Sequence, residues 1–134
     1  MIRYQLDICP KPTPRPRQGI NRKTGKKIFH YPTKYHKYKD DLLLLIKSKK
    51  IPKEDYKEIW ATFLVKYPKQ YKGGEKAKIE NAPMRQKFDC DNVLKGLLDG
   101  LQQANVIEDD RQIYITHTSK LWTKGEPKII FSLK

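Results

Sequence analysis

The chain has 134 residues, and 29 Lys and Arg against 15 Asp and Glu give it a formal net charge of +14 at pH 7. This length is typical of one domain, and a hydrophobic fraction of 37% is enough for one modest core. No apolar run approaches the roughly 18 residues of a membrane-spanning helix, and the first residues do not resemble a signal peptide. We therefore expect a cytoplasmic protein that does not insert into a membrane.

The charge and the cysteine content of the chain further limit the class of protein. A pI near 9.8 indicates a polyanionic partner, most often nucleic acid, with an anionic membrane surface as the alternative. The two cysteines, Cys9 and Cys90, are too few for a disulfide framework or a metal-ligand cluster, so we expect reduced thiols.

In the first third of the chain, the sequence pattern predicts a strand, a loop and a helix. Apolar residues alternate with polar ones from Ile2 to Ile8, which is typical of a half-buried strand. Proline then occupies every second position from Pro10 to Pro16 and excludes a helix or a sheet interior, so we expect a basic, proline-rich loop over about 10–32. Helical spacing of Tyr and Leu residues predicts a helix over about 34–49, with Thr33 as its cap.

The rest of the chain predicts three strands and a second helix. A strand over 58–67, apolar on both faces, is typical of a central position in a sheet. A basic loop over about 69–87 follows, and then a helix capped by Asp91. Strands are expected over 112–122, with Ile113 and Ile115 facing inward, and over 128–133. The order β-α-β-α-β-β predicts a single α+β domain over 1–134, with a mixed β-sheet and helices.

The positive and negative charges occupy different parts of the chain. No acid lies between Asp7 and Asp40, whereas six of the fifteen acids fall within the 22 residues from Asp89 to Asp110. Because lysine and arginine bind phosphates, we predict that DNA contacts come from the basic segments. The candidate DNA-binding residues are Lys11, Arg15, Arg17, Arg22, Lys23, Lys26, Lys27 and Lys87.

The acidic segment carries the candidate chemistry. Asp89 and Asp91 form an Asp-x-Asp pair, and in extended backbone two such side chains point to the same side and can share one ion. Carboxylate oxygens suit Mg²⁺ or Mn²⁺ rather than zinc. Lys95 and Asp99 follow at helical spacing, and residues 108–110 are expected to return toward the pair as a third acidic group.

Each of these features also has a purely structural explanation. An aspartate before a helix is a favoured N-cap, and Lys95 between Asp91 and Asp99 forms i,i+4 pairs worth only about 0.2–0.5 kcal/mol each. The acidic residues 108–110 could equally form a loop tip. The combination, rather than any one feature, indicates a site.

The residues also resemble a known family. Its pattern reads approximately D-x-D-N-x-x-K, then D-x-L, then D-D-x-Q-[IV], and this chain matches it in order at Asp89–Lys95, Asp99–Leu101 and Asp109–Ile113. The chain thus resembles the RusA family of Holliday-junction resolvases, which are crossover junction endodeoxyribonucleases. The first strand and the segment Pro12–Arg17 resemble its phage-type branch. A RusA-like fold and a bacterial or phage-encoded origin follow as expectations.

The resemblance implies roles for individual residues. Asp89, Asp91 and Asp110 correspond to the metal-binding catalytic acids and Lys95 to a catalytic lysine, with Asp109 as a further metal ligand and Asp99 in a supporting role. It also implies a Mg²⁺ or Mn²⁺ cofactor, a homodimer, and four-way DNA junctions as substrate. Two alternatives remain open: a nuclease for flaps, forks or other branched DNA, and a non-catalytic DNA-binding protein.

Overall fold

Four strands form the main sheet, in the order β1–β6–β4–β5. The computed structural model describes residues 2–14, 17–20, 23–30, 33–67, 80–85 and 88–134. Strands β1 (Tyr4–Leu6) and β4 (Glu58–Lys66) both pair antiparallel with β6 (Lys128–Leu133). Strand β5 (Ile115–Thr123) pairs parallel with β4, so the predicted mixed sheet is confirmed.

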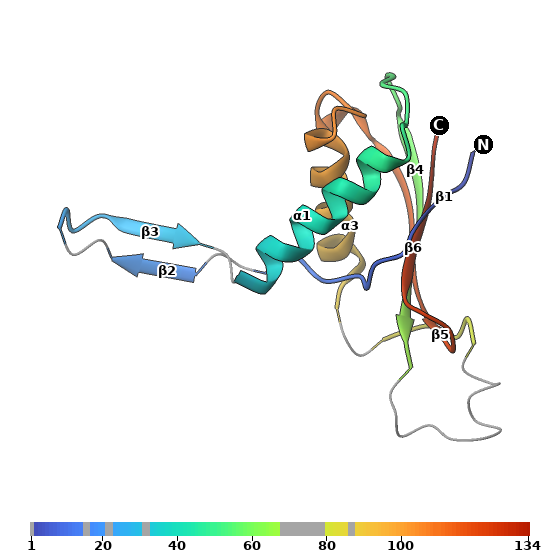
Figure 1. Ribbon diagram of the computed structural model, residues 1–134, viewed down its shortest axis with the longest axis horizontal. Coiled ribbons are helices and arrows are strands. Elements are labelled where there is room, and N and C mark those ends of the chain that lie inside the picture. The colour runs from blue at the N-terminus through green and yellow to red at the C-terminus, as the bar shows by residue number, and fades with distance from the viewer. Residues whose placement is uncertain (1, 15–16, 21–22, 31–32, 68–79, 86–87) are drawn as a thin grey trace.

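Two helices cover one face of this sheet, which we call the inner face (Figure 1). Helix α1 (Thr33–Ser48) follows the N-terminal segments, and helix α3 (Cys90–Gln103) lies between β4 and β5 in the chain. Parallel strands need a crossover connection, and α3 provides it. A single turn of 3-10 helix, η1 (Asp110–Gln112), leads from α3 back into β5.

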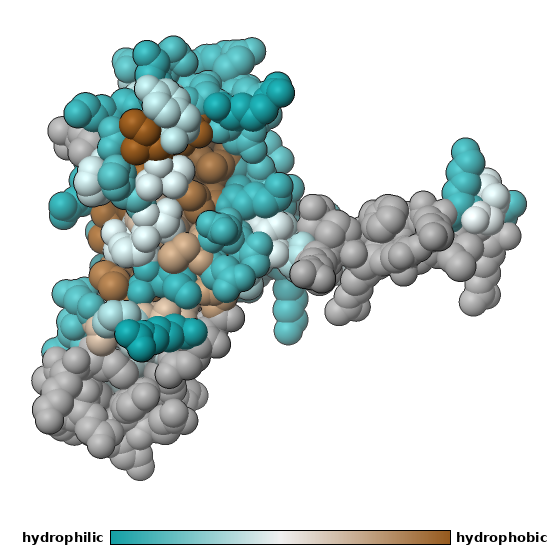
Figure 2. Space-filling view, turned by 180° about the vertical axis from the view of Figure 1, so that it is seen from behind, coloured by the Kyte–Doolittle hydropathy of each residue, from teal (hydrophilic) through white to brown (hydrophobic). Residues whose placement is uncertain are grey.

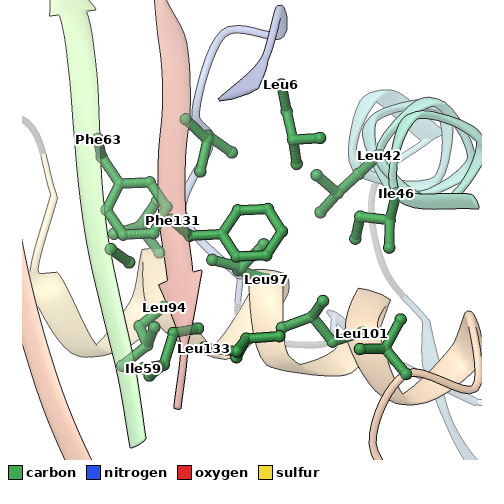
Figure 3. Packing of buried hydrophobic residues seen from close by; sticks show 14 of the residues in the cluster. Leu6, Leu42, Ile46, Ile59, Phe63, Leu94, Leu97, Leu101, Phe131 and Leu133 are labelled. Carbon is green, nitrogen blue, oxygen red and sulfur yellow. The ribbon is translucent and has the colours of Figure 1, made fainter. Parts of the chain in front are cut away.

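The core lies between the sheet and the two helices. Phe63 and Phe131 point from the sheet toward Leu97 of α3 and Leu42 of α1, as Figure 3 shows, and all four are at most 1% exposed. The helices approach closely because α3 carries a glycine there. A Cβ on Gly100 would lie 2.9 Å from Cδ1 of Ile46.

A two-stranded hairpin extends from the body of the molecule (Figure 1). Strands β2 (Arg17–Ile20) and β3 (Lys27–His30) pair antiparallel with each other and form a sheet separate from the main one. Part of the segment 10–32 that was expected to be loop is therefore strand. Residues 23–26 form the hairpin tip, and residues 21–22 lie outside the described part.

Most of the predicted elements are confirmed, with two local corrections. Helix α1 begins one residue before the predicted helix, and β4 and β6 match their predicted ranges to within a residue. Helix α3 begins at Cys90, so its N-cap is Asp89 rather than the predicted Asp91. Ile115 was predicted to face inward but is 39% exposed, because η1 occupies the start of the predicted strand and β5 begins only at Ile115.

The predicted loop over 69–87 lies largely outside the described residues; of it, 80–85 are described. Among the described residues, no helix is long and apolar enough to span a lipid bilayer.

Removing one core side chain tests this arrangement. Leu97 is 0% exposed, so Leu97→Ala should lower the free energy of unfolding by about 2–5 kcal/mol through lost burial and the cavity left behind. Leu44 lies on α1 but is 66% exposed, so Leu44→Ala should cost less than about 0.5 kcal/mol. Urea denaturation of both variants measures the two values, and equal losses would contradict the packing described.

Candidate active site

The candidate site residues lie along one side of α3. Gly96 and Gly100 face α1, where a Cβ on Gly96 would lie 3.4 Å from the Tyr35 hydroxyl. Asp91, Lys95 and Asp99 follow one another at four-residue steps, each about 6 Å along the helix, on the side that faces away from α1. Asp91 and Lys95 are exposed and Asp99 is half-buried. We call this row of side chains the α3 ledge.

Asp89 lies at the start of the ledge and is not used as a conventional cap. It occupies the N-cap position with extended backbone, yet its side chain makes no capping hydrogen bond and is exposed. Its carboxylate is therefore available to a ligand, beside the free N–H groups at the helix start. Asp91 is in the first turn of α3, so the extended backbone expected for the pair does not hold. That both carboxylates share one ion stays a prediction.

The side chain of Gln112 forms hydrogen bonds that hold the turn carrying Asp109 and Asp110. Its Oε1 accepts hydrogen bonds from the backbone N–H of Glu108 at 2.9 Å and of Asp109 at 3.4 Å. Its Nε2 donates to the carbonyls of Glu54 at 3.2 Å and Tyr56 at 3.0 Å. One half-buried amide group thus fastens the turn before β5 to the segment before β4.

Asp109 has a structural role in this turn. Its Oδ1 accepts from the Arg111 backbone N–H at 2.8 Å, and its two carboxylate oxygens pair with the Arg111 guanidinium at 3.2 and 3.0 Å. The hydrogen bond from that guanidinium lowers the pKa of Asp109 to about 2. A carboxylate already bound to arginine is poorly placed to coordinate an ion, which weighs against Asp109 as a metal ligand.

Asp110 faces the α3 ledge. Its backbone N–H donates to Oε1 of Gln102 on α3 at 3.1 Å. The hydrogen bond with Asp109 is the main cause that raises the pKa of Asp110, followed by desolvation. Repulsion from Asp99 adds to the rise and attraction to Lys95 opposes it. Asp110 thus lies on the side of α3 that carries Gln102, within electrostatic reach of Lys95 and Asp99.

The donor chemistry of the ledge fits a hard divalent cation. Within the described ranges, no three Asp, Glu, His or Cys side chains are grouped closely enough to hold a metal ion, so the predicted three-acid cluster is not formed there. Mg²⁺, however, usually keeps several waters and takes only one or two carboxylates together with substrate phosphates. Asp89 and Asp91, both exposed, satisfy that smaller requirement.

Five of the eight candidate DNA-binding residues are described, and they fall on and near the hairpin. Lys11, Lys23 and Lys26 are exposed, and the last two lie in the hairpin tip, which is hydrophilic in Figure 2. Arg17 is the first residue of β2 and Lys27 the first of β3. The remaining three, Arg15, Arg22 and Lys87, lie outside the described residues.

The base of the hairpin arm is fastened to the start of α3. The Thr13 backbone N–H and hydroxyl both donate to the Asn92 carbonyl, at 3.2 and 2.9 Å. The same hydroxyl lies 3.0 Å from the hydroxyl of Tyr35 on α1. The segment that leads to the hairpin is therefore attached to the first turn of α3, a contact that the sequence alone did not predict.

A second polar cluster lies on the outer face of the sheet. The Trp60 and His117 rings stack with centroids 3.6 Å apart, and both donate or share hydrogen bonds with Glu58 Oε1, at 2.9 and 2.8 Å. A shallow groove runs beside this stack, and none of the candidate acids lines it. Strand register could have revealed the Trp60–His117 pair, because the two residues are directly opposite each other.

Carboxylates and a lysine on one side of a helix, beside a basic arm, form the combination typical of a nuclease. The sequence model of the family described as "Endodeoxyribonuclease RusA" matches residues 8–134, and this chain belongs to that family. It is also similar to the "Crossover junction endodeoxyribonuclease RusA" of Aquifex aeolicus (strain VF5), with 40% identity over 52 residues. That match covers 39% of this chain and 41% of the relative, less than half of either.

The Asp109–Arg111 pair can be tested by titration of the metal-free protein. Arg111→Gln should raise the pKa of Asp109 from about 2 toward the usual value near 3.9. Because the folded-state pKa lies below that of the unfolded chain, the pair favours folding above about pH 4, and this contribution is lost as the pH falls toward 2. Carboxyl ¹³C NMR measures the shift.

Lys53→Gln is the matched control for this titration. Lys53 pairs with Glu108 at 2.6 Å and lowers the pKa of that neighbouring carboxyl. The control should raise the pKa of Glu108 and leave Asp109 unchanged. If Asp109 still titrates near 2 in Arg111→Gln, the ion pair does not set its pKa.

Proposed function

We propose that this protein is a metal-dependent endodeoxyribonuclease that resolves Holliday junctions by paired, symmetric nicks. The observation that carries the proposal is the α3 ledge, Asp91, Lys95 and Asp99 in a row, with the carboxylate of Asp89 free of capping bonds at its start and Asp110 on the same side of α3, in a chain of net charge +14. Membership of the endodeoxyribonuclease RusA family and the name of the Aquifex relative support the same activity.

The ledge supplies groups for phosphodiester hydrolysis. Asp89 and Asp91 would hold Mg²⁺ or Mn²⁺, which when bound activates water and stabilises the leaving oxygen. Lys95 lies one turn after Asp91 and would neutralise charge that develops on the attacked phosphate. Asp110, the third catalytic acid in this proposal, would interact with Lys95 and orient it, supported by Asp99. The expected products carry 5′-phosphate and 3′-hydroxyl ends.

The basic arm supplies affinity close to the site of cleavage. Because Thr13 is bonded to the Asn92 carbonyl, the arm leaves the body next to the first turn of α3. DNA held along the hairpin would therefore pass near Asp89 and Asp91. Phosphate contacts of this kind bind without regard to sequence, so selectivity for a branch must come from the geometry of the sites.

The symmetry of a four-way junction implies a second copy of the enzyme. Two nicks in opposing strands require two active sites, and a C2 dimer supplies two identical sites related by the symmetry of the substrate. We infer that the protein acts as a homodimer on branched DNA.

Cleavage of a panel of DNA substrates tests the proposal. Mobile and fixed four-way junctions, flaps, forks and linear duplex are incubated with wild type and Asp91→Asn, with and without Mg²⁺ or Mn²⁺. Only the junctions should be cut, in paired nicks that ligase can seal, and only with metal. Asp91→Asn should lose about 100-fold or more of the rate while binding junctions as tightly as wild type or tighter, since a charge that repels phosphate is removed.

The other outcomes of the panel are equally informative. A preference for flaps or forks would support a branched-DNA nuclease instead, and binding without cleavage a non-catalytic DNA-binding protein. Equal cutting of all substrates would leave only a general nuclease. Asp41→Asn, which neutralises an exposed acid on α1, is the control and should cleave normally.

The role of the hairpin tip can be measured by salt dependence. The double variant Lys23→Gln/Lys26→Gln should weaken junction binding and flatten the slope of log K against log salt by as much as about 2, because each lost phosphate contact removes about one released counterion. The double variant Lys47→Gln/Lys49→Gln makes the same change of charge at the other end of α1 and should leave the slope unchanged. If the two double variants gave equal slopes, the DNA would not contact the hairpin tip.

A further inference from the structure

The inner face of the sheet is apolar on β4 and β6 but partly polar on β5. Residues on β4 and β6 that face the helices are apolar, among them Phe63, which is 0% exposed. Four β5 residues are in register with this apolar row: Thr116, Thr118, Lys120 and Trp122. Trp122 is buried, whereas the two between, Thr118 opposite Ala61 and Lys120 opposite Phe63, are polar. Both are half-buried, and they face the start of α3 rather than solvent on the outer face. A polar strip therefore runs along β5 beside the candidate active site.

Strand β5 also holds the chain that leads into α3. Backbone hydrogen bonds join Asn81 and Ala82 to Trp122 at 2.9 Å each, and Met84 to the Lys120 carbonyl at 3.0 Å. The last contact is made by a side chain: the Lys120 ammonium donates to the Phe88 carbonyl at 2.5 Å. That carbonyl belongs to the peptide bond that Phe88 shares with Asp89.

Lys120 is half-buried, at a position where its neighbour on β4, Phe63, is apolar. Withdrawing an ammonium group from water costs free energy unless hydrogen bonds replace its hydration. The Phe88 carbonyl supplies one, and it is the only hydrogen bond of the Lys120 ammonium among the described residues. An ammonium has three N–H donors, and this contact uses one of them.

The hydrogen bond from Lys120 fixes the backbone next to Asp89, the residue whose side chain makes no capping bond at the start of α3. The Asp89 side chain makes no capping bond, so nothing in its own side chain fixes the backbone at the entrance to α3. The Lys120 ammonium fixes the peptide on the N-terminal side of Asp89, and the hydrogen bond from the Val93 N–H to the Asp89 carbonyl, at 3.3 Å, fixes the other side.

We propose that Lys120 is a positioning residue of the candidate active site: by bonding the Phe88 carbonyl it holds Asp89, and with it the Asp89–Asp91 pair, in place for catalysis. This inference rests on the proposed function. It adds a second lysine to the site, on β5, opposite the one that α3 carries. Groups that orient metal-binding carboxylates typically change activity by about 10–100-fold when they are removed.

Three substitutions of Lys120 and one control test the inference. Lys120→Met keeps the aliphatic chain and removes the ammonium, and Lys120→Gln is a second neutral variant with a polar end that suits the half-buried position. Lys120→Arg keeps a cationic donor. Lys128→Met removes one lysine from the same sheet, at a position in register with Leu64 on the outer face, and is the matched control.

The cleavage rate and the binding constant are measured separately. With saturating DNA and metal, both neutral variants should cleave about 10–100-fold more slowly than wild type while the Kd for DNA changes less than about twofold. Lys120→Arg should restore the rate to within about threefold, and Lys128→Met should cleave at the wild-type rate. A parallel loss of rate and affinity, without rescue by arginine, would make Lys120 a DNA contact and overturn the positioning role.

A spectroscopic measurement does not depend on activity. In the metal-free protein the ¹³C resonance of the Phe88 carbonyl and the ¹⁵N resonance of Asp89 report the hydrogen bond. They should shift in the neutral variants and far less in Lys120→Arg. Unchanged resonances in a folded neutral variant would show that the contact is absent in solution and would overturn the inference.

The two proposals fail in different ways. A wild-type protein that cuts no DNA substrate would overturn the proposed function and leave the Phe88 resonances as the test of the contact. Wild-type rates for both neutral variants, on whichever DNA the wild type does cut, would overturn the role of Lys120 alone.

Discussion

The parallel pairing of β4 with β5 constrains the rest of the structure. Parallel neighbours cannot be joined by a tight turn, so the chain must leave the end of β4, cross the inner face and return at the start of β5. Helix α3 makes that crossing and runs back past β5. The pairing thus places the start of α3 beside Lys120 and the end of α3 beside Asp110. Every candidate site residue on the ledge depends on this one connection.

The two acids before β5, Asp109 and Asp110, have different interactions. Asp109 is engaged by Arg111 and caps η1, while Asp110 faces Lys95 and Asp99. Gln112 keeps the two acids in these positions because its side chain bonds the turn at one end and the segment before β4 at the other.

The periodicity of the sequence predicted the elements that pack against the core. The alternation in β4 and the helical spacing in α1 and α3 reflect burial on one face, which hydrophobic pattern reports directly. Strands β2 and β3 lie within a segment that was expected to be loop, because proline at every second position from Pro10 to Pro16 excludes a helix or a sheet interior. The start of β5 was placed too early because a short 3-10 turn between Asp109 and Gln112 is not distinguishable from strand in one sequence.

The candidate site was predicted in composition but not in arrangement. The motif identified the acids and Lys95, whereas the distinction between Asp109 and Asp110 depends on bonds from Gln112 to carbonyls more than fifty residues away. Lys120 could not be separated from the other cations of the chain, because its position follows from the register of β5 with β4. Long-range register is a property of the assembled sheet.

The hairpin is built separately from the sheet that forms the core, since neither of its strands pairs with the main sheet. Its length and charge can therefore change between relatives at little cost to the stability of the body. Exchange of the hairpin, with Thr13 as the point of attachment, would therefore leave the packing of α3 against the sheet unchanged.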